Sequence, residues 1–519
     1  MHNHQPENRN EASVPQQENP FRQLQGPNAS LTEITKLTEL VRSVMRFLAP
    51  RVDANQPALE DAVRGFKLDP NPRTFTRLED SVMEIIATHH GWNQAQTKAA
   101  YARQRATNLD NQNWEPQSVQ ITLPHDDRFS DEYGSLARRF VDTAIPLNAH
   151  FAMQVPGAGQ FFPYEFTGKS SRSLKLPSSV TGGRVANGWL SILRTSGGEA
   201  VFEGFRTGAL IHYGEKDQKA RTESSRSAGK ELLAAIASFQ LSKLPPEEVY
   251  EIFEGRGVLP LRIASFDLQT LGAPEGTSLS IESLIVNEGM ELKRSLAGSS
   301  TIPLMFGGGT GSTVRPIKTQ IELLSFNFPV HEQSHRQGFG WQTAETEPSK
   351  GRASLLLQQA DELVASPATD AKLARKLQYL TESIRSQLEN DSYQRASSEP
   401  YRLNAHLMNL AYQLGYSVHF HCRSGKDRTA MMDAEAKLVA GLISNHDGDS
   451  GGTPLPKHAQ LFLRALLLSG ASGPISKLNS GARGLKLKPM TATEEGDPFV
   501  DRLGYDAWQE ALGFSRLFS

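Results

Sequence analysis

Residues 419–437 read HFHCRSGKDRTAMMDAEAK and contain the single cysteine of the 519-residue chain. A short apolar run, residues 417–421, precedes Cys422, and apolar residues at helical spacing follow it. The sequence therefore predicts a strand, a tight loop that contains a glycine, and then a helix. Such a loop lies at the amino end of its helix, where backbone amides lack intrahelical partners and favour an anion.

The residues of this loop indicate phosphate chemistry. A helix N-terminus and neighbouring cations favour the thiolate form of a cysteine, which is the nucleophilic form. We expect Cys422 to attack phosphorus, and Arg428 to return to the rim of the loop and bind two phosphate oxygens through its planar guanidinium. Asp427 is the candidate acid for the leaving oxygen. Thr429 is the candidate to stabilise the thiolate or to assist hydrolysis.

The remaining loop residues are expected to bind the substrate. Ser424 and Gly425 would wrap their backbone amides around one phosphate. Arg423 and Lys426 add two cations to the loop arginine, and because one phosphate does not need three cations, we expect a substrate with several phosphates. His421 is expected to orient the loop by side-chain to backbone bonding. The plain alternative is that the lone cysteine is a small buried apolar residue, but a glycine and three cations make a poor core.

The composition of the whole chain limits the classes of protein to which it can belong. A net charge of −2 gives no general attraction to nucleic acid or to an anionic membrane. A single cysteine excludes an intrachain disulfide framework, which favours a protein that works in a reducing compartment. No apolar run approaches the roughly 20 residues that cross a bilayer. The expected chemistry needs no cofactor and no metal, and we expect no nucleic-acid partner.

The sequence divides into three expected parts. Residues 1–29 are rich in Asn, Gln, Pro and Ser, and we expect them to be disordered and to be a candidate address for non-Sec export. Residues 30–150 form an expected helical module for partner binding, with helices predicted over 30–50 and 74–90. Residues 151–519 form the expected phosphatase domain, an α/β fold with α+β elaborations around the strand, loop and helix.

Local patterns after residue 115 predict mixed α and β structure. Short apolar alternations, broken by Gly, Pro and Ser, predict strands at 118–123, 189–194 and 321–328. Helical spacing predicts helices at 227–244, 353–366, 371–390 and 401–416.

The string CRSGKDRT, followed by MMDAE, resembles the signature of the SopB/IpgD-type inositol phosphate phosphatases, which bacteria deliver into host cells by type III secretion. That family's loop usually begins Cys-Lys, so Arg423 replaces its first lysine. Three other stretches are similar to family segments, and they are GEAVFEGFRTGAL at 198–210, SFNFPVHE at 325–332 and NSGARGLKL at 479–487. Thr207 and His331 replace a family histidine and asparagine, whereas Lys486 matches the family lysine. The resemblance covers roughly residues 165–490.

The resemblance implies more than the residues alone do. It implies a phosphoinositide phosphatase, notably one that removes the 4-phosphate of phosphatidylinositol 4,5-bisphosphate, or a phosphatase of soluble inositol polyphosphates. By the same resemblance Lys486 is a substrate-binding residue. The implied partners are a secretion chaperone, a host Rho-type GTPase and the host membrane surface. The implied location is the host cell cytoplasm, peripheral at membranes, reached by the type III route.

Three alternatives remain open at this point. HEQSH at 331–335 places His331 and His335 one helical turn apart, as in a zinc metalloprotease in which Glu332 activates water, although Trp341 stands where a metzincin has its third histidine. An effector with an intact loop can also act mainly by binding a host GTPase through residues 30–150. The third alternative is a protein tyrosine phosphatase, which the two extra loop cations disfavour.

Overall fold

The structure of the chain is a computed structural model. It describes residues 27–53, 56–70, 72–110, 116–123, 138–147, 153–155, 159–163, 185–213, 215–271, 280–306, 313–331, 345–394, 400–444, 455–468, 470–480, 484–485, 487 and 497–512. Its contacts divide the chain into two units, Met1–Asn93 and Gln94–Ser519, which are treated separately below. The expectation for residues 1–29 falls outside the described residues except for 27–29, which belong to the first helix.

The first unit contains three described helices, α1 (Pro27–Leu48), α2 (Pro57–Leu68) and α3 (Pro72–His90). Each begins with a proline, whose fixed φ suits the first helical turn and whose missing N–H has no intrahelical partner there. The helices enclose a small apolar core, in which the rings of Phe66 and Phe75 lie 5.1 Å apart between centroids. Gly91, with φ 65°, follows the last helix. The helices predicted over 30–50 and 74–90 correspond to α1 and α3, whereas α2 was not predicted.

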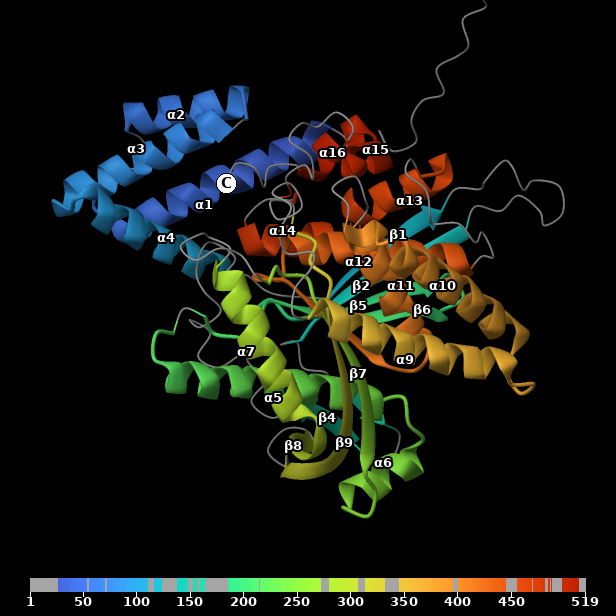
Figure 1. The fold of residues 1–519 in the computed structure, drawn as a ribbon. Helices are drawn as coiled ribbons and strands as arrows, with labels where there is room; N and C mark the ends of the chain where they lie inside the picture. The colour runs from blue at the N-terminus through green and yellow to red at the C-terminus, as the bar shows by residue number, and fades with distance from the viewer. Residues whose placement is uncertain are drawn as a thin grey trace, which may run out of the picture. The chain divides into compact units, whose positions relative to one another are not determined.

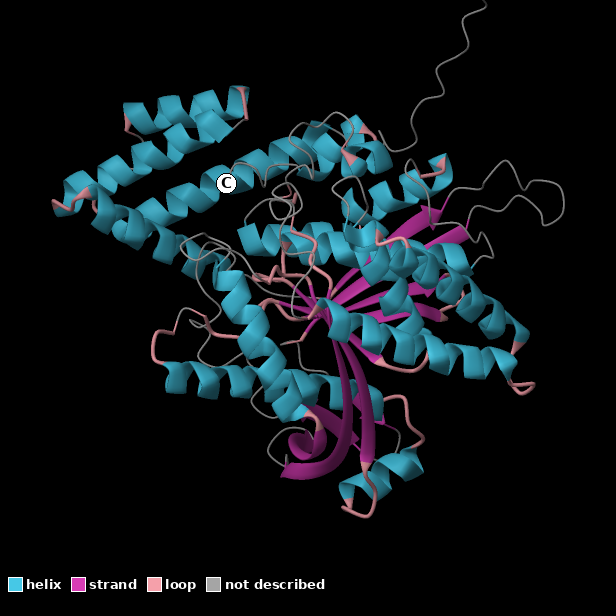
Figure 2. Ribbon diagram, in the orientation of Figure 1, coloured by secondary structure: helices cyan, strands magenta, loops and turns pink. Residues whose placement is uncertain are grey.

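The described part of the second unit contains one sheet of ten strands: β1 (Gln117–Leu123), β2 (Arg138–Pro146), β3 (Met153–Val155), β4 (Gly159–Pro163), β5 (Trp189–Thr195), β6 (Ala200–Thr207), β7 (Leu259–Asp267), β8 (Gly298–Phe306), β9 (Thr313–Asn327) and β10 (Ser417–His421). Their order across the sheet is β1-β2-β5-β6-β10-β7-β9-β8-β4-β3. The four strands β6, β10, β7 and β9 run parallel, and every other pair is antiparallel. Figure 2 shows the strands converging near the centre of the view, with helices around them.

The parallel strands end together at one edge of the sheet. The last residues of β6, β10, β7 and β9 are in register with one another, and they are Thr207, His421, Asp267 and Asn327. Ligand sites of sheets with parallel strands lie at the carboxyl ends of those strands, so this row is the place where a site is expected. All five residues of β10 are buried, as befits the strand that is flanked on both sides by parallel neighbours.

The described helices of the second unit are α4 (Gln94–Asp110), α5 (Gln218–Leu241), α6 (Pro246–Phe253), α7 (Ser280–Leu296), α9 (Thr346–Ala365), α10 (Ala371–Glu389), the 3-10 turn η4 (Ser392–Gln394), α11 (Pro400–Gln413), α12 (Asp427–Ser444), α13 (Lys457–Leu468), α14 (Ser472–Ser480), α15 (Pro498–Leu503) and α16 (Tyr505–Leu512). Figure 1 shows α5 and α7 on one side of β7, and α9, α11 and α12 on the other. The sheet is therefore covered by helices on both faces, which is the arrangement expected for parallel strands.

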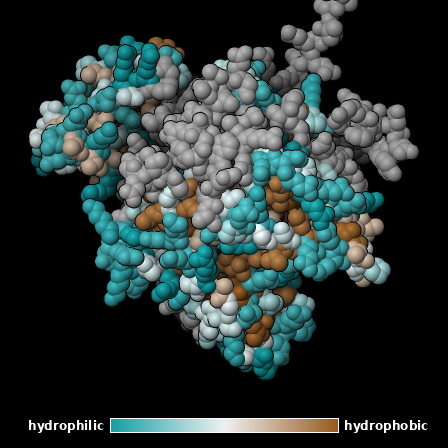
Figure 3. Space-filling model, in the orientation of Figure 1, coloured by the Kyte–Doolittle hydropathy of each residue, from teal (hydrophilic) through white to brown (hydrophobic). Residues whose placement is uncertain are grey.

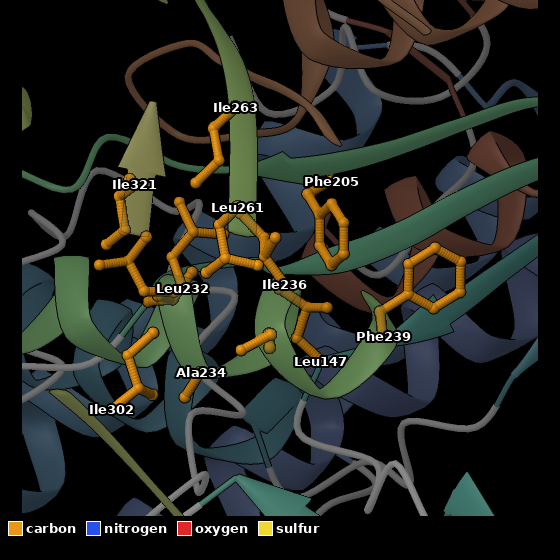
Figure 4. Packing of buried hydrophobic residues seen from close by; sticks show 14 of the residues in the cluster. Leu147, Phe205, Leu232, Ala234, Ile236, Phe239, Leu261, Ile263, Ile302 and Ile321 are labelled. Atoms are coloured by element: carbon orange, nitrogen blue, oxygen red, sulfur yellow. The ribbon is translucent and has the colours of Figure 1, made fainter. Parts of the chain in front are cut away.

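The larger core lies between α5 and the sheet. Leu232 and Ile236 of α5 pack toward Leu261 and Ile263 of β7, with Phe205 of β6 beside them (Figure 4). Small and branched side chains along the buried face of α5 allow the helix to approach the strands closely. The mixed α/β class that the sequence predicts is confirmed by this architecture.

The last part of the expected helical module contains strands. β1 and β2 lie within residues 30–150, the expected helical module, but they pair with β5 in the sheet of the second unit. Burial along β2 follows the two-residue period of a strand, since every second residue is buried from Phe140 onward. The predicted strands at 118–123, 189–194 and 321–328 correspond to β1, β5 and β9.

The surface of the face shown in Figure 3 is largely hydrophilic, with apolar patches near its centre. Among the described residues, no helix combines the length and the apolar character that a bilayer crossing requires.

Candidate active site

The loop at the end of β10, residues 422–426, is called the cysteine loop here; it joins His421 to Asp427, the first residue of α12. Gly425 has φ 68°, a conformation that side chains disfavour. A β-carbon at that position would also stand 2.5 Å from the carbonyl oxygen of Thr207. The glycine is therefore required both by the backbone angle and by the close approach of β6.

The nucleophile candidate lies at the bottom of the loop. Cys422 is only 2% exposed, and its backbone N–H donates to the hydroxyl oxygen of Thr429 at 3.1 Å. Thr429 is itself fully buried in the first turn of α12. This bond ties the start of the loop to the start of the helix, so the loop closes on itself as a compact turn.

Arg428 faces a buried carboxylate that the sequence analysis did not identify. Its two terminal nitrogens lie 2.5 and 3.2 Å from the two oxygens of Glu282, and a third bond of 3.4 Å reaches the carbonyl oxygen of Leu268. Glu282 also accepts the backbone N–H of Thr270 at 3.0 Å, and His331 lies 3.8 Å away. Burial opposes ionisation of Glu282, but Arg428 and His331 outweigh it and lower the pKa of this carboxyl.

The three cations within residues 422–428 are not equivalent. Lys426 is buried, at 3% exposed, and its ammonium lies 3.8 Å from Asp427. Arg428 is 11% exposed and carries Glu282 as its counter-charge. Arg423 is half-buried and its guanidinium lies over the ring of Tyr213, 5.0 Å from the centroid. Two of the three positive charges are thus partly balanced by carboxylates, which weakens the inference of a polyphosphorylated substrate from charge alone.

A buried group of ionisable side chains lies behind the loop. His421 Nε2 is 3.1 Å from the ammonium of Lys293 and 3.8 Å from Asp267. Burial lowers the pKa of Lys293 and raises the pKa of Asp267. Burial and the adjacent Lys293 hold the pKa of His421 well below its usual value, so this imidazole is neutral at physiological pH. The sequence analysis expected His421 to bond with backbone, whereas the described contact of its ring is with the Lys293 side chain.

A second histidine links β6, β7 and β10. His419 Nδ1 lies 2.9 Å from the hydroxyl of Ser265, and its Nε2 lies 2.9 Å from that of Thr207. Because the Thr207 hydroxyl donates to the carbonyl oxygen of Gly208, it accepts from Nε2–H, and Nδ1 accepts from Ser265. Burial holds the pKa of His419 well below its usual value, so this chain of bonds is uncharged.

A second buried arginine supports the loop from β6. Arg206 donates to the carbonyl oxygen of Gly425 at 3.4 Å, to Ser472 at 2.9 Å and to Asp433 at 3.3 Å. Burial lowers the pKa of Arg206, and the adjacent Asp433 carboxylate opposes that shift. Arg206 lies in the stretch 198–210 and Asp433 in the MMDAE that follows the loop, and both stretches are similar to segments of the family. That similarity was the signal that could have identified the two residues.

Several predicted site residues cannot be placed. Lys486, Glu332 and His335 lie outside the described residues. Of the HEQSH string only His331 is described, and it faces Glu282. Within the described residues, no group of three His, Cys, Asp or Glu side chains is arranged to hold a metal ion. The zinc interpretation stays an alternative drawn from sequence.

Comparisons with known proteins identify a family and individual relatives. Residues 77–518 match the family described as enterobacterial virulence protein IpgD. The inositol phosphate phosphatase IpgD of Shigella flexneri is 24% identical over 88% of this chain and 82% of its own length. The inositol phosphate phosphatase SopB of Salmonella typhi is 26% identical over 81% of this chain and 72% of its own.

Solved structures share the fold at low identity. The crystal structure of a Legionella phosphoinositide phosphatase, SidF, matches with a TM-score of 0.58 at 10% identity, covering 92% of this chain and 91% of that chain. A further Legionella phosphoinositide phosphatase structure, determined to explain substrate recognition, matches with a TM-score of 0.59 at 10% identity over 92% and 90% of the two chains.

Proposed function

Because the chain belongs to the family of the enterobacterial virulence protein IpgD, we propose that it removes phosphate from inositol phosphates through a covalent cysteine intermediate. Its enzyme class is that of an inositol phosphate phosphatase, a phosphoric monoester hydrolase. The observation that carries the proposed chemistry is the cysteine loop, in which a buried Cys422 starts a turn that closes on Thr429 in the first turn of α12. The core of strand, loop and helix resembles that of the protein tyrosine phosphatases.

In the first step the Cys422 thiolate attacks phosphorus, and the bond between phosphorus and the leaving oxygen breaks. The amides of Ser424 and Gly425, at the amino end of α12, bind the non-bridging oxygens. Arg428, held by Glu282, is proposed to donate to the same oxygens. Asp427 is our proposed acid, and it transfers its proton to the leaving oxygen.

In the second step water attacks the phosphocysteine. Asp427, now a carboxylate, accepts a proton from that water, and the bond between sulfur and phosphorus breaks to release inorganic phosphate and the thiolate. Thr429 supports this leaving thiolate through the start of α12, where its hydroxyl oxygen already bonds the Cys422 backbone.

The proposed substrates are phosphoinositides and soluble inositol polyphosphates. We further propose that the phosphate removed is the 4-phosphate of phosphatidylinositol 4,5-bisphosphate. Arg423 supports a second phosphate, because its stacking on Tyr213 holds a cation at the loop without a carboxylate among its described contacts. Lys486 is proposed to bind the substrate as well. Lys426, which is buried beside Asp427, is better suited to hold that carboxylate than to reach a distant phosphate.

Phosphate release from a panel of phosphoinositides and inositol polyphosphates tests this function, with phosphotyrosine peptide as the competing substrate. The Cys422→Ser protein should lose about 10⁴-fold or more of the native rate, because the covalent route is removed. Full activity in Cys422→Ser would end the covalent mechanism, and a preference for phosphotyrosine would replace the proposed substrate class.

The first unit is the proposed partner-binding part of the chain. Phe47 and Leu68 are 65% and 80% exposed there and are the apolar side chains that we propose for partner contact. A secretion chaperone and a host Rho-type GTPase are the proposed partners, and delivery by the type III route to the cytoplasmic side of host membranes is the proposed destination. Measuring binding of a Rho-type GTPase to the full chain and to Phe47→Ser tests the second of these partners.

A further inference from the structure

A turn far from the cysteine loop in sequence holds the back of that loop. The side-chain nitrogen of Asn187, which lies just before β5, donates to the carbonyl oxygen of Gly425 at 2.7 Å and to that of Ser424 at 3.3 Å. The preceding residue, Ala186, accepts the backbone N–H of Gly208 at 2.7 Å, so the turn is also attached to the end of β6. Asn187 is fully buried, which shields these bonds from water.

The orientation of this amide is fixed by a tryptophan. The indole Nε1 of Trp189 lies 2.8 Å from Oδ1 of Asn187. An indole nitrogen can only donate, so the atom of Asn187 that faces it must be the oxygen. The nitrogen of the same amide therefore faces the loop, and the two carbonyl oxygens of the loop receive its two hydrogens.

The backbone of Asn187 is held in a conformation that costs free energy. Its φ is 48°, the left-handed region that non-glycine residues rarely adopt, although asparagine does so more readily than most. Such angles persist where the surrounding structure demands them and are concentrated at functional sites. Here the angle places a buried amide against the back of the loop.

One further loop carbonyl, and a second side-chain donor, take part in this restraint. The carbonyl oxygen of Arg423 accepts the N–H of Ala209 at 3.3 Å, and that of Gly425 also accepts from Arg206. In a trans peptide the carbonyl of one residue and the N–H of the next point in opposite directions. Holding the carbonyls of residues 423–425 on the protein side therefore directs the N–H groups of 424–426 away from it, where an anion can be bound.

We propose that Asn187, oriented by Trp189, is a positioning residue that fixes the amides of Gly425 and Lys426 toward the phosphate of the substrate. The inference rests on the proposed function, since it assigns the role of this amide within the same site. Asn187 touches no reacting atom; it acts through the two carbonyls that it holds.

Binding of inorganic tungstate, a phosphate-like oxyanion, measures the loop amides without any turnover. Asn187→Asp is nearly isosteric but places a carboxylate oxygen against the two carbonyls, and it should weaken tungstate binding about 10-fold or more. Asn187→Gly keeps the left-handed turn and removes the side chain, and it should weaken binding similarly. Both should lower kcat by about 10²-fold, since small displacements of a catalytic group have effects of that size.

Asn409 offers a matched control. It too is a buried asparagine whose side-chain nitrogen donates to two backbone carbonyls, those of Ala405 and Ala436, at 2.8 and 2.9 Å. Asn409→Ala should lower the thermal midpoint but leave tungstate affinity and kcat at native values. Trp189→Phe keeps most of the packing but releases the amide, and it should reproduce part of the Asn187→Asp defect.

The outcomes separate the inference from the proposed function. Native tungstate affinity in both Asn187 variants overturns the inference, as does failure of the native protein to bind tungstate. An equal loss of affinity in Asn409→Ala would reduce the effect to general packing and would also overturn it. Full phosphate release by Cys422→Ser, together with weakened tungstate binding in the Asn187 variants, would overturn the proposed covalent chemistry and leave the inference in place.

Discussion

At the scale of single residues, Arg428 is restrained before a substrate binds. Both of its terminal nitrogens donate to the carboxylate of Glu282. The position of Glu282 on α7 and the backbone N–H of Thr270 hold that carboxylate in place. A guanidinium that is already restrained loses less rotational freedom when phosphate binds, which is the usual benefit of preorganisation. Glu282 is therefore as much a part of the site as the arginine that the sequence pointed to.

Glu282→Gln should lower kcat by about 10²-fold, because the neutral amide leaves Arg428 without its counter-charge and misplaces the guanidinium. Steady-state phosphate release measures this change. The matched control is Glu288→Gln, which breaks a similar forked pair with Arg221 on α5, where the nitrogens lie 2.6–3.1 Å from the carboxylate. Equal kcat values for the two variants would contradict a specific role for Glu282.

Gly425→Ala should abolish activity and destabilise the fold, because the added β-carbon meets the backbone of Thr207 and Gly208. Gly415→Ala provides the comparison, since Gly415 also has a positive φ, 83°, but has nothing within 4 Å of the added carbon. The control should lose only about 1–2 kcal/mol, the usual strain of a left-handed angle. Urea unfolding and phosphate release measure both variants, and similar losses in the two would show that strain alone governs Gly425.

The site residues that sequence could identify are those inside the loop. Cys422, Arg428 and their neighbours are contiguous, so their spacing was visible in one line of text. Glu282 is 146 residues from Arg428, and Asn187 is 238 residues from Gly425, so no local pattern connects either to the loop. Only the folded sheet brings these partners together.

At the scale of elements, α12 is anchored by a buried ionic cluster. The ammonium of Lys437 lies 2.5 Å from Asp142 on β2 and 3.1 Å from Asp433, one turn earlier on α12. Asp142 also accepts the N–H of Ala471, just before α14. The cluster therefore joins the helix that carries the cysteine loop to the antiparallel side of the sheet.

Lys437→Met should destabilise the protein by about 3–5 kcal/mol, because two buried carboxylates lose their shared cation. Urea denaturation measures the change. The exposed pair of Arg256 and Glu251 is the control, and Glu251→Gln should leave the stability nearly unchanged, because exposed ion pairs contribute little. A small effect of Lys437→Met would mean that Asp142 and Asp433 take up protons without cost.

The elements themselves were predictable to different degrees. β10 and α12 were predicted because a short apolar run and a helical pattern flank the loop. The order of the strands was not predictable, since β10 comes last among the strands in sequence and yet lies between β6 and β7. That position depends on long-range pairing, on which local periodicity carries no information.

At the scale of the whole molecule, one histidine gives the stability a defined pH dependence. His406 on α11 is fully buried, and its Nδ1–H donates to the carbonyl oxygen of Arg402 at 2.7 Å. Burial, with help from the charge of Arg402, lowers the pKa of His406 from 6.5 to about 3. A histidine whose folded pKa is depressed contributes stability above its unfolded pKa and loses it as the pH falls toward the folded value.

Between pH 7 and pH 5 the native protein should therefore lose about 2 kcal/mol more stability than His406→Gln, in which no group titrates at that position. Urea unfolding at the two pH values measures the difference. Glutamine can still bond the Arg402 carbonyl, which makes the variant a fair reference. Parallel losses in the two proteins would show that His406 keeps an ordinary pKa in the folded state.

The division of the chain was only partly visible in its sequence. Two of the three described helices of the first unit, α1 and α3, followed from their apolar spacing. The unit ends at residue 93, however, and β1 and β2 belong to the sheet. The separation of residues 30–150 as a module thus remains a proposal for partner binding. The boundary of a domain depends on which elements pack their apolar faces together. The apolar pattern of one element does not show which other element it packs against.

The single cysteine also determines how the enzyme would respond to peroxide. Oxidation of Cys422 gives a sulfenic acid, and no resolving cysteine exists in the chain to capture it. Recovery then depends on an outside reductant such as glutathione, or on cyclisation to a neighbouring backbone nitrogen. A second oxidation yields a sulfinic acid, which glutathione does not reduce. A molecule oxidised to that level therefore stays inactive.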